Sequence, residues 1–245
     1  MTRRVCVFAS VVAASLSATA AWAEVLAPGS LRALPARAGS PSSLVVNASF
    51  DQPPGAELQA YNVDIARGFR FDPRAAGARC TVRRARSGTC PASSKIGGGV
   101  GRLSVKSATL PRTRFVVDIA FYLMRPQRRG DIAGLVLAGR EPASGVRFAL
   151  LGRLVGLRHG RYGLELRFAH TARELPSGFQ VQLRRVHVRF GTDRTVLLRH
   201  GGQTKPVTYH LLTNPRACSA SGWPFLLTVT YSTGPERYTT RAACK

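Results

Sequence analysis

The chain has 245 residues, with 36 lysines and arginines against 12 aspartates and glutamates, so its formal net charge at pH 7 is +24. The small number of acids leaves few candidates for the two facing carboxylates that a glycosidase needs. Only four of the cations are lysines, a preference that fits a high-GC coding bias. Two interpretations explain the charge equally well: a solvated surface of biased composition, or genuine binding to anionic partners.

The first 23 residues have the three parts of a secretory signal peptide. Arg3 and Arg4 form a basic start, an apolar run follows, and Ala21-Trp22-Ala23 supplies the small residues that precede cleavage. A membrane anchor is the alternative, but serines interrupt the run, which is short for the ~30 Å of hydrocarbon in a bilayer. We expect cleavage to leave 222 residues with a net charge of +22, secreted or at the cell surface and without a transmembrane span in the mature chain.

Residues 24–43 are rich in proline, alanine, glycine and serine and show no sustained period. This composition predicts a flexible linker at the mature N-terminus. We expect the folded part of the chain to comprise residues 44–245, as one β-sandwich domain or as two smaller sandwiches.

From residue 44 onward, apolar and polar residues alternate with the period of β-strands. In residues 179–190 the alternation is reset at Arg184-Arg185, which predicts a β-bulge. Residues 114–123 are apolar on almost both faces, which favours a central strand that is covered twice. Turn-forming residues separate the other expected strands, at residues 44–50, 58–65, 100–107, 132–138, 146–155, 162–168, 207–212 and 225–231. About ten short strands predict an all-β fold, an antiparallel β-sandwich or jelly roll.

Four cysteines remain after the signal peptide: Cys80, Cys90, Cys218 and Cys244. An even number in an exported chain indicates two disulfides, and of the three possible pairings we favour the local one, Cys80–Cys90 with Cys218–Cys244. A zinc site is the alternative, but the spacings lack the close ligand pairs that such sites use. We therefore expect no metal.

A glycine-rich stretch, SSKIGGGVG, occupies residues 93–101. A phosphate-binding loop requires its lysine after the last glycine, whereas Lys95 precedes Gly97 here, and the glycine spacing of a dinucleotide-binding site is also absent. The stretch is better interpreted as the exit from the small disulfide loop into a strand, where the glycines permit positive φ or close approach of a neighbouring strand.

Two short motifs carry a resemblance. The sequences CPASSKIGGG (residues 90–99) and TNPRAC (residues 213–218), with Trp223 and the terminal Cys244-Lys245, resemble a group of exported proteins of high-GC actinobacteria that share C-P-x-x-S-x-I-G-x-G and T-N-P-x-x-C boxes. The resemblance covers residues 44–245. It implies an extracytoplasmic location and a β fold, but no particular reaction.

Residue types that carry catalysis do not form a recognisable motif. The five histidines lack metal-ligand spacing, no serine stands in G-x-S-x-G, and a triad dispersed along the chain stays open. Asp118 lies within the apolar strand expected at residues 114–123, where a carboxylate either pairs with an arginine or has a raised pKa; we favour pairing. We therefore assign no catalytic residue and no cofactor.

A basic face is the remaining candidate site. If the strands at residues 162–168 and 179–190 pair, four side chains share its outward surface: Arg167, Arg185, His187 and Arg189. Such a face suits anionic cell-wall polymer or lipid headgroups, whereas nucleic acid would bind only non-specifically because outward aromatic residues for stacking are few. The oligomeric state stays open.

The sequence thus predicts an exported, non-catalytic protein of the cell envelope or extracellular space that binds anionic envelope polymers through basic faces. The alternative is a secreted carbohydrate-active or other hydrolytic enzyme on a β-sandwich scaffold. A subunit of a larger surface assembly is a third interpretation.

Overall fold

The computed structural model describes residues 29–50, 56–106, 113–169, 180–201 and 203–245. The expected signal peptide (residues 1–23), residues 24–28 and Phe179 lie outside these described residues. Within them, strands account for almost all of the regular structure, and no helix is long and apolar enough to cross a membrane.

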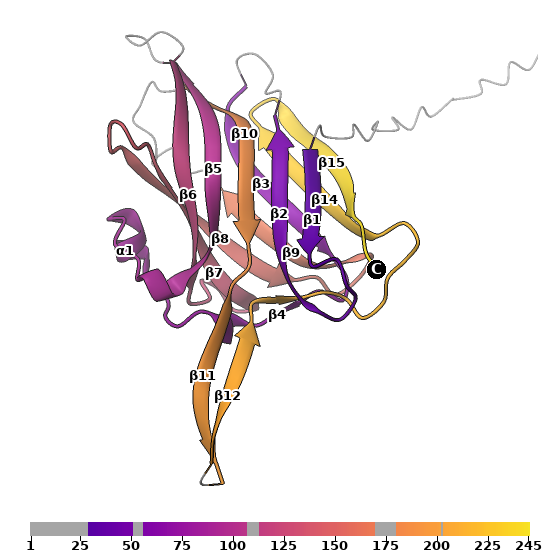
Figure 1. Cartoon of the computed structure of the whole chain (residues 1–245). Helices are drawn as coiled ribbons and strands as arrows, with labels where there is room; N and C mark the ends of the chain where they lie inside the picture. The colour runs from indigo at the N-terminus through magenta and orange to yellow at the C-terminus, as the bar shows by residue number, and fades with distance from the viewer. Residues whose placement is uncertain (1–28, 51–55, 107–112, 170–179, 202) are drawn as a thin grey trace, which may run out of the picture.

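Thirteen strands form one antiparallel sheet (Figure 1). In spatial order the main path runs β15 (Gly234–Ala242), β14 (Trp223–Tyr231), β3 (Leu58–Ala66), β9 (Tyr162–Ala169), β8 (Arg147–Gly156), β7 (Asp131–Arg140), β6 (Thr113–Met124), β5 (Lys95–Lys106), β10 (Gln180–Phe190) and β2 (Pro41–Ser49). β2 also pairs with β1 (Gly29–Leu34) and with β13 (Leu212–Thr213), which continues to β4 (Arg70–Phe71).

A second, two-stranded sheet consists of β11 (Asp193–His200) and β12 (Gln203–His210). This hairpin projects from the body of the molecule (Figure 1). Its base contacts η1 (Pro73–Ala75), and the guanidinium of Arg74 lies 4.6 Å from the centre of the Tyr209 ring.

The main sheet curls so that its inner face encloses one large apolar core. Phe121 of β6 contacts Phe168 of β9 and Phe190 of β10, with ring centroids 6.5 and 5.8 Å apart. The sheet ends β1 and β15 lie side by side, and the backbone of Lys245 exchanges hydrogen bonds with Ala36 and Ala38 after β1. The predicted all-β antiparallel class is confirmed, and the packing of one part of the sheet against another is that of a β-sandwich.

Strand positions were predicted well wherever the alternation is regular, and the bulge predicted at Arg184-Arg185 is present, because the register of β10 on β5 shifts between Leu183 and Arg185. The linker prediction was wrong over residues 29–43. Despite its proline and glycine content this segment contains β1 and the start of β2, because Leu31 and Ala33 are buried in the core.

The prediction that residues 114–123 are covered on both faces holds for only part of β6. Its inner face is core, but on its outer face Val116 is 50% exposed and Asp118 is exposed. Cover of the outer face begins at Tyr122, which packs against a small cluster beneath α1 (Val82–Arg86).

Both predicted disulfides are present, Cys80–Cys90 and Cys218–Cys244. Each closes a short loop and contributes about 3 kcal/mol in the chain-entropy account. The first loop contains α1 and leads through η2 (Ala92–Ser94) into β5. It is fixed to the outer face of the sheet by the burial of Cys80 and Ala85 against Met124 and Val136.

Candidate functional site

The glycines of residues 97–99 bring β5 unusually close to its neighbours. A Cβ on Gly99 would lie 2.7 Å from the Cα of Val188 and closer still to the carbonyl oxygen of His187, both on β10. A Cβ on Gly98 would lie 2.7 Å from the carbonyl oxygen of Ile119 on β6. The glycines are therefore required by close strand approach, as the sequence indicated, and β10 and β6 are the strands that need the space.

A row of small residues begins at Gly98 and crosses the outer face of the sheet. Gly98 of β5 is in register with Ala120 of β6, which pairs with Ala138 of β7, which pairs with Ala149 of β8. With strands about 4.8 Å apart, this row is roughly 14 Å long. It forms a shallow floor because none of its side chains extends beyond a methyl group.

The α1 loop forms one wall above this floor. Ala85 of α1 is buried in the small cluster that Ala138 and Ala149 also contact, so the loop lies on the same face of the sheet as the row of small residues. The side chain of Arg147 reaches this wall: its Nη1 lies 2.9 Å from where a Cβ of Gly88 would be.

The floor and wall border a pocket of about 640 Å³. Its size lies in the range of small-molecule sites. The Nζ of Lys95 lies 3.6 Å from where a Cβ of Gly98 would be, so this lysine lies over the floor. Five cationic side chains line the pocket, and they come from α1, β5, β7, β8 and β10: Arg86, Lys95, Arg140, Arg147 and Arg189. We call this pocket the basic pocket.

The cations of the basic pocket have no carboxylate partner within the part of the chain that the structure describes. Arg189 donates a hydrogen bond from Nη2 to the hydroxyl of Ser43 at 3.1 Å, which leaves its charge unneutralised. Asp118 is the one described carboxylate that lines the pocket. It opposes Arg140 in the register of β6 and β7, but no ion pair forms between them.

The expected burial and pairing of Asp118 were therefore wrong. Its side chain is exposed because it points to the outer face of β6, which is open at this position. Asp118 belongs to the rim of the basic pocket and not to the core.

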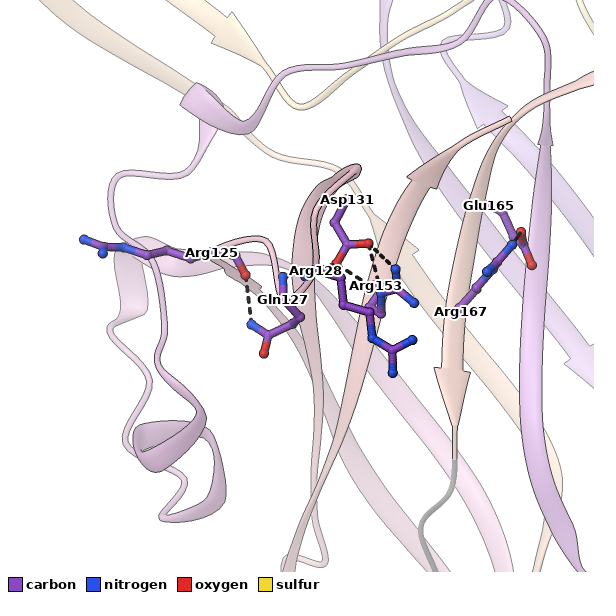
Figure 2. Close-up of polar contacts among 7 residues, drawn as sticks. All are labelled: Arg125, Gln127, Arg128, Asp131, Arg153, Glu165 and Arg167. Atoms are coloured by element: carbon purple, nitrogen blue, oxygen red, sulfur yellow. Dashed lines mark hydrogen bonds and ion pairs between the residues drawn. The ribbon is translucent and has the colours of Figure 1, made fainter. Parts of the chain in front are cut away.

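Asp131 on β7 and Glu165 on β9, in contrast, do have cationic partners (Figure 2). Asp131 accepts hydrogen bonds from Nε of Arg153 at 2.9 Å and from the backbone N–H of Arg128 at 2.8 Å, and Glu165 accepts one from Arg167 at 2.6 Å. The hydrogen bonds from Arg153 are the main cause that lowers the pKa of Asp131.

A second acid group lies beside this network. Asp64 on β3 opposes Glu165 on β9. Burial, with the charge of Glu165 as a further cause, raises the pKa of Asp64 to about 6, although Arg167 and Arg237 act in the opposite direction. Neither Asp64 nor Glu165 lines the basic pocket.

The four side chains of the predicted basic face do not lie together. Arg185, His187 and Arg189 do share the exposed outer side of β10. Arg167 does not join them because β9 pairs with β3 and β8, and four strands separate it from β10. The two segments do not pair, so the condition on which the face of four residues depended is not met.

Four cations of the basic pocket were missed: Arg86, Lys95, Arg140 and Arg147. They come from four separate segments, so only the order and register of the strands bring them together. The local signal that could have drawn attention to this surface is one small outward residue on each of β5, β6, β7 and β8: Gly98, Ala120, Ala138 and Ala149.

The described residues show few features of a metal site or a sugar-binding site. The structure places no group of three or more histidines, cysteines or acids in a metal-binding arrangement among its described residues. His210 pairs with Asp193 at 2.9 Å on the projecting hairpin. Trp223 is only 3% exposed and donates its indole N–H to the carbonyl of Ala217, so it offers no platform for a sugar ring.

No protein-family model, no curated protein and no solved structure matches the chain.

Proposed function

We propose that this protein is an exported, non-catalytic component of the cell envelope or extracellular space, and that it holds the anionic groups of envelope polymers in the basic pocket. The observation that carries the proposal is the convergence of five cations on one pocket with a single carboxylate. Two disulfides support an oxidising location, where such bonds form and persist.

Electrostatics favours an anion in this pocket. Each pair of like charges about 8 Å apart in water repels by roughly 0.5 kcal/mol, and a bound anion replaces those repulsions with attractions. Arginine is well suited to this task because its planar guanidinium donates two parallel hydrogen bonds to phosphate or carboxylate. Four of the five cations are arginines: Arg86, Arg140, Arg147 and Arg189.

The alternative, a hydrolytic enzyme, would rest on Asp64 and Glu165. A raised carboxyl pKa beside a second carboxylate is the pattern of an acid–base pair. Against it, Glu165 is held by Arg167, and the two acids lie outside the basic pocket. An ion-pair network that perturbs the pKa of one member explains the pair equally well and needs no substrate.

A charge-removal experiment tests the proposal. The double variant Arg140→Gln and Arg147→Gln removes two pocket cations, and the matched control Arg158→Gln with Arg216→Gln removes the same charge from exposed arginines outside the pocket. Binding of poly(glycerol phosphate) is measured by titration calorimetry near physiological salt. We expect affinity to fall about tenfold, or 1.4 kcal/mol, in the pocket variant and less than about twofold in the control.

Equal losses of affinity in the two variants would show that only the total charge of the protein matters, and would contradict binding in the basic pocket. Absence of measurable binding by the unmodified protein would remove the proposed function. Thermal unfolding of both variants verifies that neither has lost its fold.

A further inference from the structure

A second arginine-lined pocket lies on the same outer face, further along β5, β6 and β10. Its volume is about 670 Å³. Its described lining contains no acid and four arginines: Arg102, Arg114, Arg184 and Arg185. We call this the distal pocket.

The register shows that the two pockets are consecutive stretches of one surface. Gly98 at the floor of the basic pocket and Arg102 in the distal pocket both belong to the outer face of β5. They are four residues apart, and four residues of a strand span about 13 Å. Ser104, at the far side of the distal pocket, lies roughly 20 Å from Gly98 along the strand. On β10, Arg189 lines the first pocket and Arg185 the second.

The surface between the pockets does not separate them. His187 and Val100 oppose each other there, on β10 and β5, and both are exposed, so no bulky element rises between the two sets of arginines. Asp118, opposite Val100 on β6, is the one described acid in the lining of either pocket.

Resting on the proposed function, we propose that the basic and distal pockets are two subsites for one extended phosphodiester chain, which runs along β5 and β10. A single anionic group cannot reach both sets of arginines across about 13 Å, whereas a chain with a phosphate in every repeat can. Binding at two linked points strengthens attachment because the second point is engaged at high effective concentration once the first is occupied.

The lining favours a chain that lacks nucleobases. Single-stranded nucleic acids are held by aromatic side chains on which the bases stack. The described aromatic residues of the two pockets are Tyr122, Phe148 and Phe115. Tyr122 is committed to the cluster beneath α1, and Phe148 packs with the large core. Phe115 alternates with the exposed Arg114 and Val116 along β6, so it belongs to the inner face. The arginines therefore suit the charged backbone of a polyol phosphate chain or a sugar phosphate chain.

The test uses two probes and three variants of the full-length protein. The probes are glycerol 3-phosphate, which carries one anionic group, and a glycerol phosphate oligomer whose extended length exceeds ~20 Å. The variants are Arg140→Gln with Arg147→Gln in the basic pocket, Arg102→Gln with Arg114→Gln in the distal pocket, and Arg158→Gln with Arg216→Gln as the charge-matched control.

We expect the unmodified protein to bind the oligomer about a hundredfold more tightly than the monomer. The distal variant should lose about tenfold in oligomer affinity, while its intact basic pocket should still bind one glycerol 3-phosphate with the affinity that this pocket has in the unmodified protein. The slope of log affinity against log salt should decrease by about one for each phosphate that the variant no longer binds. The basic-pocket variant should weaken both probes.

If the distal variant binds the oligomer as the control does, the two-subsite inference fails, while loss of both probes in the basic-pocket variant would still uphold the proposed function. If no variant differs from the control for either probe, the proposed function itself fails. Tighter binding of a single-stranded DNA of equal charge than of the oligomer would overturn the assignment to a chain without bases.

Discussion

At the scale of single residues, charge balance distinguishes two regions of the outer face of the sheet. Arg153 and Arg167 are each paired with a carboxylate, and these pairs lie on β7, β8 and β9. The cations of the basic pocket have no such partner within the described chain. An unneutralised cluster is the feature that a binding site for anions requires, whereas a paired network is a common structural device.

Asp64 gives a prediction about pH dependence. Because its pKa is about 6 in the folded protein and 3.8 in the unfolded chain, the folded state binds more protons between these values, so stability decreases as pH rises from about 4 to about 6. Asp64→Asn should remove this decrease and raise the free energy of unfolding at pH 8 by about 1 kcal/mol, a figure reduced for the partial exposure of the group.

Urea unfolding of both proteins across pH 4 to 8 checks this prediction. The sign is opposite to that of Asp131, whose lowered pKa stabilises the fold above its unfolded value and loses that contribution as pH falls. A profile for Asp64→Asn that follows the unmodified protein between pH 4 and 6 would contradict the assignment of the raised pKa to Asp64.

Among the elements, β5 shapes the floor of the site because its glycines allow close approach to β10 and β6. The TNPRAC segment has a comparable structural role: Asn214 is fully buried, and its amide donates hydrogen bonds to the carbonyls of Pro35 and Arg37, both at 2.8 Å. The glycines of residues 97–99 and Asn214 thus have structural roles, and the glycines also border the basic pocket.

A pair of alanine variants tests the role of β5. Gly99→Ala places a methyl group against the backbone of β10, so we expect a loss of about 3 kcal/mol in the free energy of unfolding. Gly156→Ala is the control, because its new methyl group would lie 3.7 Å from Ile132, an ordinary contact, and should change stability by less than about 0.5 kcal/mol.

Chemical denaturation measures both changes. Similar stabilities of the two alanine variants would show that β5 and β10 can separate without a loss of stability. Close strand approach would then not explain the glycines at residues 97–99.

The elements also show what the sequence could and could not predict. Alternation is local, so β6, β9 and the bulge of β10 were found from their own residues. Neighbour relations are not local: nothing within residues 162–168 or 179–190 shows that four strands separate them. β1 was missed because a six-residue strand beside prolines has little pattern of its own and depends on its pairing with β2.

The same limit applies to the candidate site. Arg189 was identified because it alternates visibly along one strand, but Arg86, Arg140 and Arg147 converge with it only through the order of β5 to β8 and the position of the disulfide loop. Composition supplied the excess of cations, and the fold determined which of them are concentrated in one place.

For the whole molecule, the curled sheet produces an uneven distribution of charge. The described ion pairs of the sheet lie on β9 and where the start of β7 meets the end of β8. The opposite ends of β7 and β8 carry Arg140 and Arg147 of the basic pocket, and the two arginine-lined pockets follow one another along β5, β6 and β10. A surface of this kind attracts polyanions over a distance of about 8 Å at physiological salt and then holds them by direct contacts. Binding should therefore weaken steeply as salt concentration rises.

The most direct test of the central claim is a crystal structure of the protein grown with the glycerol phosphate oligomer. The account predicts phosphate density in the basic pocket within hydrogen-bond distance of Arg140, Arg147 and Lys95, above the floor formed by Gly98 and Ala120. Phosphates bound at another face, with the basic pocket occupied only by solvent, would contradict it.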